Sequence, residues 1–435
     1  MKTGETVRIE SITDDGRGVA HKDGFTYFVK GAIPQDVVRI KVCSKKKRYA
    51  FAEVLEVESF SPLSVVPHDK YQRCSGGAAI SRLQYSAQLS EKNAIVKNAL
   101  NRIAKVNLLD NVFEPIIGMT DPDRYRNKAR YASAVMPDGR IGFGSYLPNS
   151  NDVLFEHDSI IYKKENAAIL DECSVWLNTV DRSCVISELI IRTAFDNKKL
   201  IVIKGECKAQ RGLSLLKGLA DSLIKAFPSI ESVVRQDAKT GIIEVLYGTG
   251  SITDRLAGLR FKISADTFFQ VNHLQTEVLY KKIFESAELT GCQQVWDLFC
   301  GVGTISLMLS KKAKLVRGND IAFSSIQNAK ENAELNNIEN AIFECGKASC
   351  VLTKWIKQYE KPDLIVLDPP RSGCAPEVLK TILRILPSRI IYVSCKPSTL
   401  SRDIAILKQS YCVKKIMPVD MFPHTAHVET IAVLE

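Results

Sequence analysis

An apolar strand that runs directly into a glycine turn constrains this chain more than any other stretch. Residues 295–298 read Val-Trp-Asp-Leu, the turn Phe299-Cys300-Gly301-Val302-Gly303 follows, and an apolar helix starts near Ile305. In an open α/β sheet, ligands bind in the crevice at the carboxyl ends of the strands, and glycines let the backbone bend sharply and a ligand come close. A second strand, 315–319, ends at Asp320, about twenty residues on, where a ribose-binding carboxylate is expected. The stretch predicts a nucleoside-binding α/β domain.

The turn departs from the dinucleotide-binding fingerprint. That pattern, GxGxxG, needs a third glycine where Ser306 stands, so a nucleoside ligand without a pyrophosphate fits better. Because glycine turns also join strands to helices for steric reasons alone, the pairing with Asp320 carries the prediction. Asp297 and Asp320 would suit a cofactor with positive charge near the turn.

The composition indicates a folded, basic chain of two or three domains. It has 435 residues, 45% of them hydrophobic, and a net charge of +10, which favours a polyanionic partner or serves solubility alone. Its 12 cysteines have no regular spacing and do not form a disulfide framework. We find neither a signal peptide nor a run near about 18 apolar residues. We therefore expect no membrane span and a soluble, reduced, cytoplasmic protein.

Residues 1–58 have the pattern of a small β-barrel. Polar and apolar side chains alternate at 5–12, 37–42 and 52–57, with turn signals between them. An expected loop carries four cations beside an aromatic residue: Lys45, Lys46, Lys47 and Arg48. Such a run is often only a solvated turn. On a short barrel it is also a common way to hold a nucleic-acid backbone.

Residues 59–260 are expected to form a central α+β domain with a helix at 84–105 that packs on the domain after it. The run 124–131 mixes cations with tyrosines, which suits phosphate contact combined with base stacking. Its candidate RNA-binding residues are Arg126, Lys128 and Arg130. An exposed strand with ordinary cross-strand packing explains the run equally well.

Residues 261–435 alternate strands and helices in the manner of a doubly wound α/β domain. Strands are expected near 295–298, 315–319, 341–344, 364–367, 390–394 and 431–434. The fourth of these delivers Asp368, and Pro369 and Pro370 then stiffen the loop ahead of Arg371. That loop could hold a planar base against a carboxylate.

Two further groups of reactive side chains follow later strands. Cys395 ends the strand at 390–394 beside Lys396, and a nearby cation lowers the pKa of a partly exposed thiol, although most such cysteines are small buried hydrophobes. His424, His427 and Glu429 come just before the last strand. No neighbouring cysteine or carboxylate pattern completes a zinc site with the two histidines, so we predict no metal.

In this order the glycine turn, the Asp-Pro-Pro loop, the strand-end cysteine and the His/Glu segment resemble the RNA 5-methyluridine (uracil-C5) methyltransferases that use S-adenosyl-L-methionine. The segment 268–272, Phe-Phe-Gln-Val-Asn, adds to the likeness. Residues 1–58 resemble a TRAM domain, an RNA-binding OB-like barrel, through Asp-Gly-Arg-Gly-Val-Ala and Val-Lys-Gly-Ala-Ile-Pro-Gln-Asp. The resemblance implies an α/β fold with a C-terminal Rossmann-like methyltransferase domain, an N-terminal TRAM barrel and a central α+β domain.

The resemblance also implies a role for each site residue. Cys395 is expected to be the nucleophile and Glu429 the base that removes a proton, while Asp368, Gln270 and Arg371 bind the substrate. The expected cofactor-binding residues are Gln270, Asp297, Phe299, Gly301, Gly303, Asp320 and Asp368. The chemistry requires such groups, since uracil C5 becomes nucleophilic only after a thiolate adds to C6, and the adduct must then lose H5 to a base.

Two departures from the family pattern bear on cofactors. Many members bind an iron–sulfur cluster through four cysteines, but here Cys74 stands among Ser75 and Ala78, and residues 156–160 offer no thiol. One thiol cannot hold a cluster that needs four, so we expect none. Lys347 replaces an acid that often meets the adenine, which puts adenine recognition there in doubt.

The sequence leaves several alternatives. A 5-methylcytosine RNA enzyme typically places its cysteine inside the Asp-Pro-Pro-type loop, whereas Cys374 here lies beyond it, and an adenine amino-methylating enzyme would want an aromatic residue in place of Arg371. A non-catalytic RNA-binding assembly factor would not need Cys395 and Glu429. The leading barrel favours 23S rRNA over the tRNA T-loop as substrate, and a monomer is expected.

Overall fold

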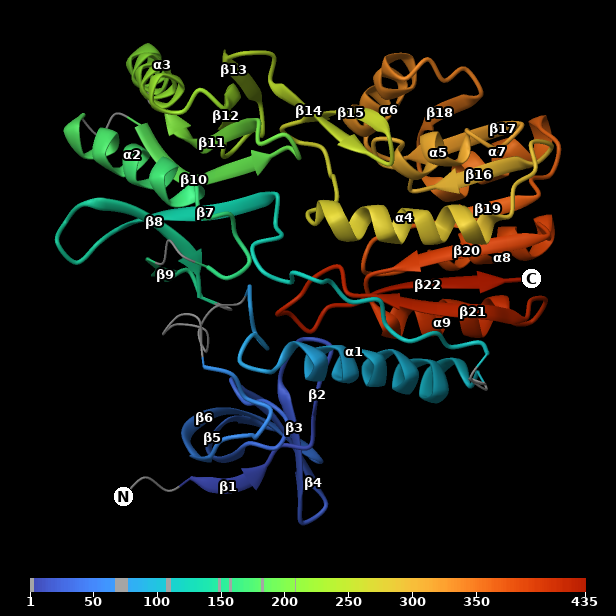
Figure 1. The fold of residues 1–435 in the computed structure, drawn as a ribbon, viewed down its shortest axis with the longest axis horizontal. Coiled ribbons are helices and arrows are strands. Elements are labelled where there is room, and N and C mark those ends of the chain that lie inside the picture. The colour runs from blue at the N-terminus through green and yellow to red at the C-terminus, as the bar shows by residue number, and fades with distance from the viewer. Residues whose placement is uncertain are drawn as a thin grey trace. The chain divides into compact units, whose positions relative to one another are not determined.

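The protein divides into two compact units. In the computed structural model, residues 4–66, 77–106, 111–147, 150–155, 159–180, 184–207 and 209–435 are described. The first unit comprises 1–122 and 366–435, and the second comprises 123–365. Among the described residues, no helix has the length and apolar character needed to cross a membrane. Figure 1 shows the elements and their labels.

The first unit begins with a six-stranded sheet in the order β1-β5-β6-β4-β3-β2. Its strands are β1 (Glu5–Arg8), β2 (Ser11–Ile12), β3 (Gly18–Lys22), β4 (Phe25–Lys30), β5 (Val37–Lys45) and β6 (Tyr49–Ser59). Alternate side chains enter a core that includes Val7, Val29, Val38 and Ile40, as the period of two in the sequence predicts. Lys46, Lys47 and Arg48 form the turn between β5 and β6.

The rest of the first unit supports three strands near the C-terminus. Strand β22 (Glu429–Leu434) lies between β20 (Arg389–Ser394) and β21 (Val413–Val419), antiparallel to both. Helices α8 (Pro376–Ile385) and α9 (Pro397–Leu407) precede and follow β20, and α1 (Tyr85–Ala99), with the π-helical turn η1 (Leu100–Ala104), packs on α9. Phe113 and Ile117 make isolated bridges to Ile416 and Val419 of β21.

The second unit contains a seven-stranded sheet in the order β13-β12-β11-β10-β7-β8-β9. These strands are β7 (Lys128–Val135), β8 (Ile141–Tyr146), β9 (Val153–Leu154), β10 (Cys184–Thr193), β11 (Lys199–Cys207), β12 (Ile230–Asp237) and β13 (Ile243–Tyr247). Helices α2 (Asn166–Thr179) and α3 (Ala209–Ala226) share a core with the sheet, which includes Tyr131, Phe143, Leu189 and Leu219. A hairpin of β14 (Ser251–Leu256) and β15 (Leu259–Ser264) follows.

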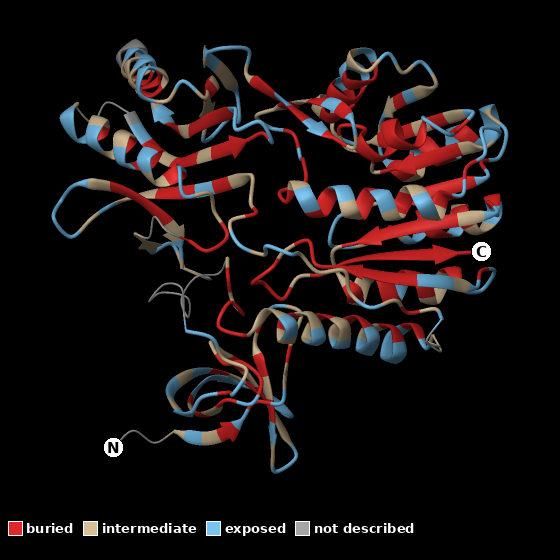
Figure 2. Ribbon diagram, in the orientation of Figure 1, coloured by how far each residue is buried: buried red, intermediate tan, exposed pale blue. Residues whose placement is uncertain are grey.

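The remainder of the second unit is an α/β arrangement of parallel strands. It contains α4 (His273–Ala287), β16 (Gln294–Leu298), α5 (Thr304–Leu309), β17 (Leu315–Asp320), α6 (Phe323–Leu335), β18 (Ala341–Cys345) and α7 (Ala348–Gln358). β17 pairs in parallel with both β16 and β18. β19 (Leu364–Leu367) crosses the division between the units. Figure 2 shows β16 as buried, whereas α4 alternates buried and exposed turns, a contrast expected when helices cover a parallel sheet.

The strands expected in this region are all present, whereas β21 was not predicted from the sequence. Lys414, Lys415 and Pro418 interrupt its apolar pattern. β21 ends the order of named strands, and its outer side pairs with residues 112–117. Pro418 cannot donate there, but its carbonyl still accepts from the backbone N–H of Ile117 at 3.0 Å. The expectation of no iron–sulfur cluster involves Cys74, Ser75 and residues 156–158, which lie outside the described residues.

Candidate functional site

The register of β20 against β22 brings the two expected catalytic residues together. The ladder ends at the pair Ser394 and Thr430, and one more step in the same antiparallel register sets Cys395 opposite Glu429. Glu429 is 4% exposed, and Cys395 is half-buried. A thiol and a carboxyl therefore lie side by side where these strands end.

Burial and mutual repulsion raise the pKa values of these groups. Burial raises the pKa of Cys395 to about 11, assisted by the negative charges of Glu429 and Asp368, while Arg371 opposes the shift. Burial also raises the pKa of Glu429 to about 8, with a smaller contribution from Asp368 and again opposition from Arg371. Asp368 itself has a pKa raised by burial to about 7. The four side chains are thus close enough to influence one another.

The sequence-based expectation about the thiol was wrong in direction. We expected Lys396 to lower the pKa of Cys395, yet burial raises it, and the cation that opposes the rise is Arg371. Lys396 instead precedes α9, where its carbonyl accepts from Thr399 at 3.1 Å. Although Lys396 is next to Cys395 in the sequence, its charge does not lie at the sulfur.

Cys374, the alternative nucleophile, is in an unfavourable environment. It is buried, and desolvation raises the pKa of its thiol to about 12. Its backbone N–H donates to Asp403 at 2.8 Å, and the same carboxylate accepts from Tyr392 at 2.6 Å. This cysteine therefore serves the packing behind the Asp-Pro-Pro loop.

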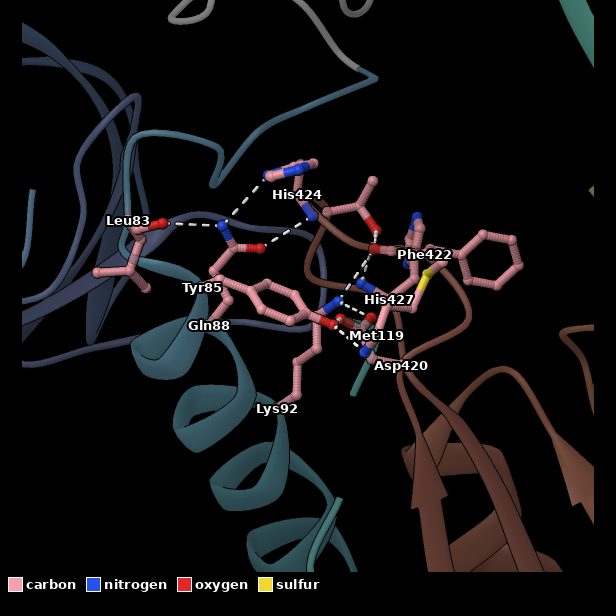
Figure 3. Close-up of polar contacts among 10 residues, drawn as sticks. Leu83, Tyr85, Gln88, Lys92, Met119, Asp420, Phe422, His424 and His427 are labelled. Atoms are coloured by element: carbon pink, nitrogen blue, oxygen red, sulfur yellow. Dashed lines mark hydrogen bonds and ion pairs between the residues drawn. The ribbon is translucent and has the colours of Figure 1, made fainter. Parts of the chain in front are cut away.

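The segment that leads into Glu429 is held by α1 (Figure 3). Lys92 and Asp420 form a fully buried ion pair at 2.5 Å, and Lys92 also donates to the carbonyl of Phe422 at 3.0 Å. Tyr85 donates to the other oxygen of Asp420 at 2.9 Å and accepts from the backbone N–H of Met119 at 2.8 Å. Burying either charge without its partner would be costly. The ion pair therefore fixes the start of this segment against α1.

A second pair of contacts holds the middle of the same segment. Gln88 accepts from the backbone N–H of His424 at 2.9 Å, and its amide nitrogen lies 3.3 Å from Nδ1 of that ring. His424 adopts a positive φ of 66°, a conformation that a histidine keeps only when its surroundings enforce it. We call these contacts, made by Tyr85, Gln88 and Lys92, the α1 latch.

The two histidines have structural contacts of their own. Nε2 of His427 accepts from Arg371 at 3.2 Å, so this histidine supports the cation that faces the reactive groups. No set of three or more metal-binding side chains gathers among the residues that the structure describes.

The α1 latch was missed by the sequence analysis, although a signal was present. Lys92 falls between Leu89 and Val96 on the apolar stripe of the predicted helix, and a lysine at such a position requires a buried partner. Its partner lies 328 residues away. That separation hid the pair from any local pattern.

The expected cofactor-binding turn lies in the second unit, at the carboxyl ends of β16 and β17. Phe299, Gly301 and Gly303 all have positive φ, at 68°, 55° and 84°. The backbone N–H of Gly301 donates to Asp320 at 3.1 Å. Asp297 is buried and accepts from Ser306 at 2.5 Å. Asp320 is therefore hydrogen-bonded to the glycine turn.

This turn has the shape that a close ligand needs. A Cβ on Gly301 would meet no heavy atom within 4 Å, whereas one on Gly303 would approach the ring of Phe343 to 3.0 Å. Gly301 thus borders open space, and Gly303 allows the helix to pack. Ile321, directly after Asp320, is 72% exposed and offers an apolar surface beside the carboxylate. These features fit a nucleoside cofactor.

Gln270 and Lys347 occupy other parts of the second unit. The backbone carbonyl of Gln270 accepts from Asn127 at 3.0 Å, and its side chain is buried. Phe268, two residues earlier, is 67% exposed and was not singled out from the sequence. Lys347 is exposed at the N-cap of α7 and makes no capping hydrogen bond there, where an acid would favour the helix.

The basic run of the second unit is split between surface and core. Arg126 and Lys128 are half-buried, and Arg130 is exposed. Burial and the charges of Arg192, Arg130 and Arg126 lower the pKa of Lys128 to about 8. Arg130 is also ion-paired with Glu188, so part of this positive charge is balanced within the sheet, and the remainder favours an anionic ligand.

The tyrosines of that run do not serve base stacking. Tyr125 and Tyr131 are buried, and Tyr131 belongs to the core beneath the sheet. The stacking expectation for this run is therefore wrong. Tyr131 is one of the residues of β7 that point inward, and Tyr125, which precedes the strand, is buried as well. The hairpin cations Lys45, Lys46, Lys47 and Arg48 are all exposed.

The fold and the similarity to known proteins identify an S-adenosyl-L-methionine-dependent RNA methyltransferase with an N-terminal TRAM domain. Residues 219–435 match the tRNA (Uracil-5-)-methyltransferase family, and residues 3–55 match the TRAM domain. The chain is 37% identical to an uncharacterized RNA methyltransferase of Halalkalibacterium halodurans, over 99% of this chain and 96% of that protein. An uncharacterized RNA methyltransferase of Listeria innocua is 36% identical, over 98% of this chain and 96% of that protein. The chain belongs to the family of RNA uracil-5-methyltransferases.

A solved structure gives the same assignment for the whole chain. The tRNA (uracil-54, C5)-methyltransferase of Pyrococcus abyssi, in complex with S-adenosyl-L-homocysteine, superposes with a TM-score of 0.78 at 25% identity. The match covers 99% of this chain and 100% of that one. The predicted α/β fold, the TRAM barrel and the S-adenosyl-L-methionine cofactor are confirmed.

The burial of Glu429 predicts a pH-dependent stability difference. Its pKa rises from 4.5 to about 8 on folding, so the protonated carboxyl stabilises the fold below pH 4.5 and that stability is lost as the pH rises through 8. Glu429→Gln should therefore become more stable relative to the wild type as the pH rises from 5 to 8. The difference in the free energy of unfolding should grow by up to about 1.4 kcal/mol per pH unit. Calorimetry across this range measures it.

The control for that measurement is Glu377→Gln, which removes an exposed carboxylate at the start of α8. A constant difference between Glu429→Gln and the wild type across the pH range would contradict the burial of an ionisable group at this position.

The α1 latch predicts a large stability effect from one lysine. Lys92→Met leaves the charge of Asp420 buried without its partner, which costs about 3–5 kcal/mol, whereas Lys97→Met removes an exposed cation from the same helix. Thermal unfolding should separate the two variants clearly. Adding Asp420→Asn to Lys92→Met should recover part of the loss. Equal stability of the two lysine variants would show that the ion pair is not a stabilising element.

Proposed function

We propose that this protein forms 5-methyluridine in RNA through a covalent intermediate on Cys395. The observation that supports the proposal is the register that sets Cys395 opposite the buried Glu429. Methylation at uracil C5 needs a nucleophile and a base on one face of the ring. A side-by-side pair on neighbouring strands meets that requirement.

In the first step Cys395 reacts as the thiolate, after its thiol proton has passed to solvent. The sulfur bonds to uracil C6, and the electron pair of the C5–C6 bond moves toward C5 and O4. Arg371, the cation that opposes the burial-driven rise in the pKa of Cys395, favours the thiolate. Asp368, with a pKa of about 7, is protonated in part of the molecules at neutral pH and can then donate a hydrogen bond to the developing negative oxygen. We assign base binding to Asp368, Arg371 and Gln270.

When bound, S-adenosyl-L-methionine supplies the electrophilic methyl group that C5 takes up. Residues Asp297, Phe299, Gly301, Gly303 and Asp320 would hold it, with Gln270 and Asp368 contributing at the reactive end. Asp320 suits the ribose hydroxyls, and the acids suit the sulfonium charge. Lys347 does not reproduce the usual acid of this family, so adenine contacts must come from other residues.

In the last step Glu429 accepts H5, the C5–C6 double bond re-forms, and the C6–S bond breaks to release Cys395. A carboxylate with a pKa near 8 is a stronger base than an ordinary glutamate. Glu429 must be deprotonated at that moment, so we expect turnover to rise with pH up to about 8.

We propose 23S rRNA as the substrate and cytoplasmic action as a monomer. The basic barrel hairpin and the cation cluster around Lys128 would hold the RNA backbone. In this proposal residues 1–58 form the barrel, residues 59–260 the central RNA-binding domain and residues 261–435 the methyltransferase domain. The T-loop of tRNA is the second candidate, because a tRNA (uracil-54, C5)-methyltransferase matches this chain over nearly its whole length.

A substrate assay decides between these RNAs. Protein is incubated with methyl-tritiated S-adenosyl-L-methionine and unmodified 23S rRNA or tRNA transcripts, and the digested nucleosides are separated. We expect label in 5-methyluridine from 23S rRNA. Label from tRNA alone would move the assignment to the T-loop, and label in 5-methylcytidine would contradict the proposed reaction.

Blocking the last step should trap the intermediate. Glu429→Gln retains addition and methylation but lacks the base, so a protein–RNA adduct should survive denaturing electrophoresis. Cys395→Ala should form no adduct and lose methyl transfer while keeping RNA affinity. An adduct formed by Cys395→Ala, or turnover by that variant at the wild-type rate, would exclude Cys395 as the nucleophile.

A further inference from the structure

The outer face of the barrel carries aromatic side chains where polar ones are expected. Strands β4 and β6 pair in parallel, with Thr26 opposite Tyr49 and Phe28 opposite Phe51. The alternate residues of both strands, Tyr27, Val29, Ala50 and Ala52, are buried in the barrel core. Phe28, Tyr49 and Phe51 therefore point away from that core, on the outward side of the sheet.

These three rings form a cluster at the surface. The ring centroids of Phe28 lie 5.8 Å from Tyr49 and 5.6 Å from Phe51, and Tyr49 and Phe51 are 5.6 Å apart. Tyr49 is 37% exposed, and the guanidinium of Arg17 lies 4.7 Å from the centroid of Phe51. The cluster thus combines π surfaces with a cation.

The cluster lines a groove of about 530 Å³, within the usual range of about 300–1,000 Å³ for ligand sites. We call it the barrel groove, formed by Arg17, Phe28, Arg48, Tyr49 and Phe51. Two acids, Asp14 and Asp15, also border it, and Asp15 is paired with Arg17 at 3.4 Å.

Cross-strand packing alone explains the groove less well. Aromatic pairs between strands do stabilise sheets, but the barrel already has a closed apolar core on its inner side. An aromatic patch on the outer side gains nothing from that core and is left partly in water. Exposed apolar patches rimmed by polar residues mark binding surfaces.

The charges around the groove select its occupant. Arg48 belongs both to the groove and to the exposed hairpin with Lys45, Lys46 and Lys47. Rings suited to stacking beside a row of cations match unpaired bases joined by phosphates. A base in a duplex would not present its face to these rings.

We propose that the barrel groove is a stacking site for unpaired nucleotides, in which Phe28, Tyr49 and Phe51 contact bases while Arg48 and the hairpin lysines hold the phosphates. The inference rests on the proposed RNA-methylating function and extends it, because it states that the substrate presents a single-stranded segment to the barrel as well as a uridine to Cys395.

The test measures binding of a fluorescent oligouridine to the full-length protein by anisotropy over a range of salt concentrations. Phe51→Leu and Phe28→Leu should weaken binding about fivefold or more, as loss of one stacked base does, with an unchanged salt dependence. Phe51→Tyr, which keeps the ring, should bind as the wild type does. Lys46→Gln should instead reduce the salt dependence, because it removes a phosphate contact.

Two controls separate stacking from damage to the fold. Phe60→Leu removes another exposed aromatic residue of the same unit, one that also has an arginine, Arg82, over its ring at 5.6 Å, and should leave affinity unchanged. An abasic oligonucleotide should bind the wild type and Phe51→Leu equally, because it offers no base to stack.

Several results would overturn the proposal. Unchanged oligouridine affinity in both leucine variants would do so, as would an equal loss with the abasic strand. An equal loss of oligouridine affinity in Phe51→Leu and Phe51→Tyr would show that the aromatic ring does not contribute to binding. The binding assay contains no S-adenosyl-L-methionine and scores no methylation, so it can fail while 5-methyluridine is formed, and it can succeed if that activity is absent.

Discussion

The pairing of β20 with β22 is the constraint on which the rest of the first unit depends. One antiparallel register places a thiol and a carboxyl opposite each other at the strand ends, where burial raises the pKa of both Cys395 and Glu429. If both groups were charged, their mutual repulsion would destabilise the pair. Arg371 offsets it for both groups, and His427 supports Arg371.

The elements around this pair explain why it stays in place. The segment between β21 and β22 would be free to move on its own. The α1 latch ties it down through Lys92, Tyr85 and Gln88. Ile12 of the barrel packs with Ile80 and with Ala426 of this same segment. The barrel and the helix therefore both contact the segment that leads into Glu429.

The sequence predicted the parts of the fold that have local patterns. Strand β16 and its glycine turn, Asp320 and the barrel strands follow from periodicity and turn residues, and the roles assigned to Cys395 and Glu429 came from family resemblance. Strand β21, which was not predicted, shows the limit of local patterns, since two lysines and a proline interrupt the apolar pattern of a strand that pairs on both sides. The direction of the Cys395 pKa shift could not be foreseen, because it depends on Glu429 and Arg371, which only the folded chain brings near. Lys92 and Asp420 are a similar case, as are the three rings of the barrel groove, which only the register of β4 against β6 aligns.

The most direct test of the central claim is to identify the protein atom that bonds to uracil. RNA containing 5-fluorouridine accepts the thiol and then the methyl group but has no H5 for Glu429 to remove, so the adduct persists. Mass spectrometry of the digested adduct should find a methylated fluorouridine on the peptide that contains Cys395. Attachment to Cys374 or another of the 12 cysteines, or no adduct with RNA that the protein methylates when it contains uridine, would contradict the account.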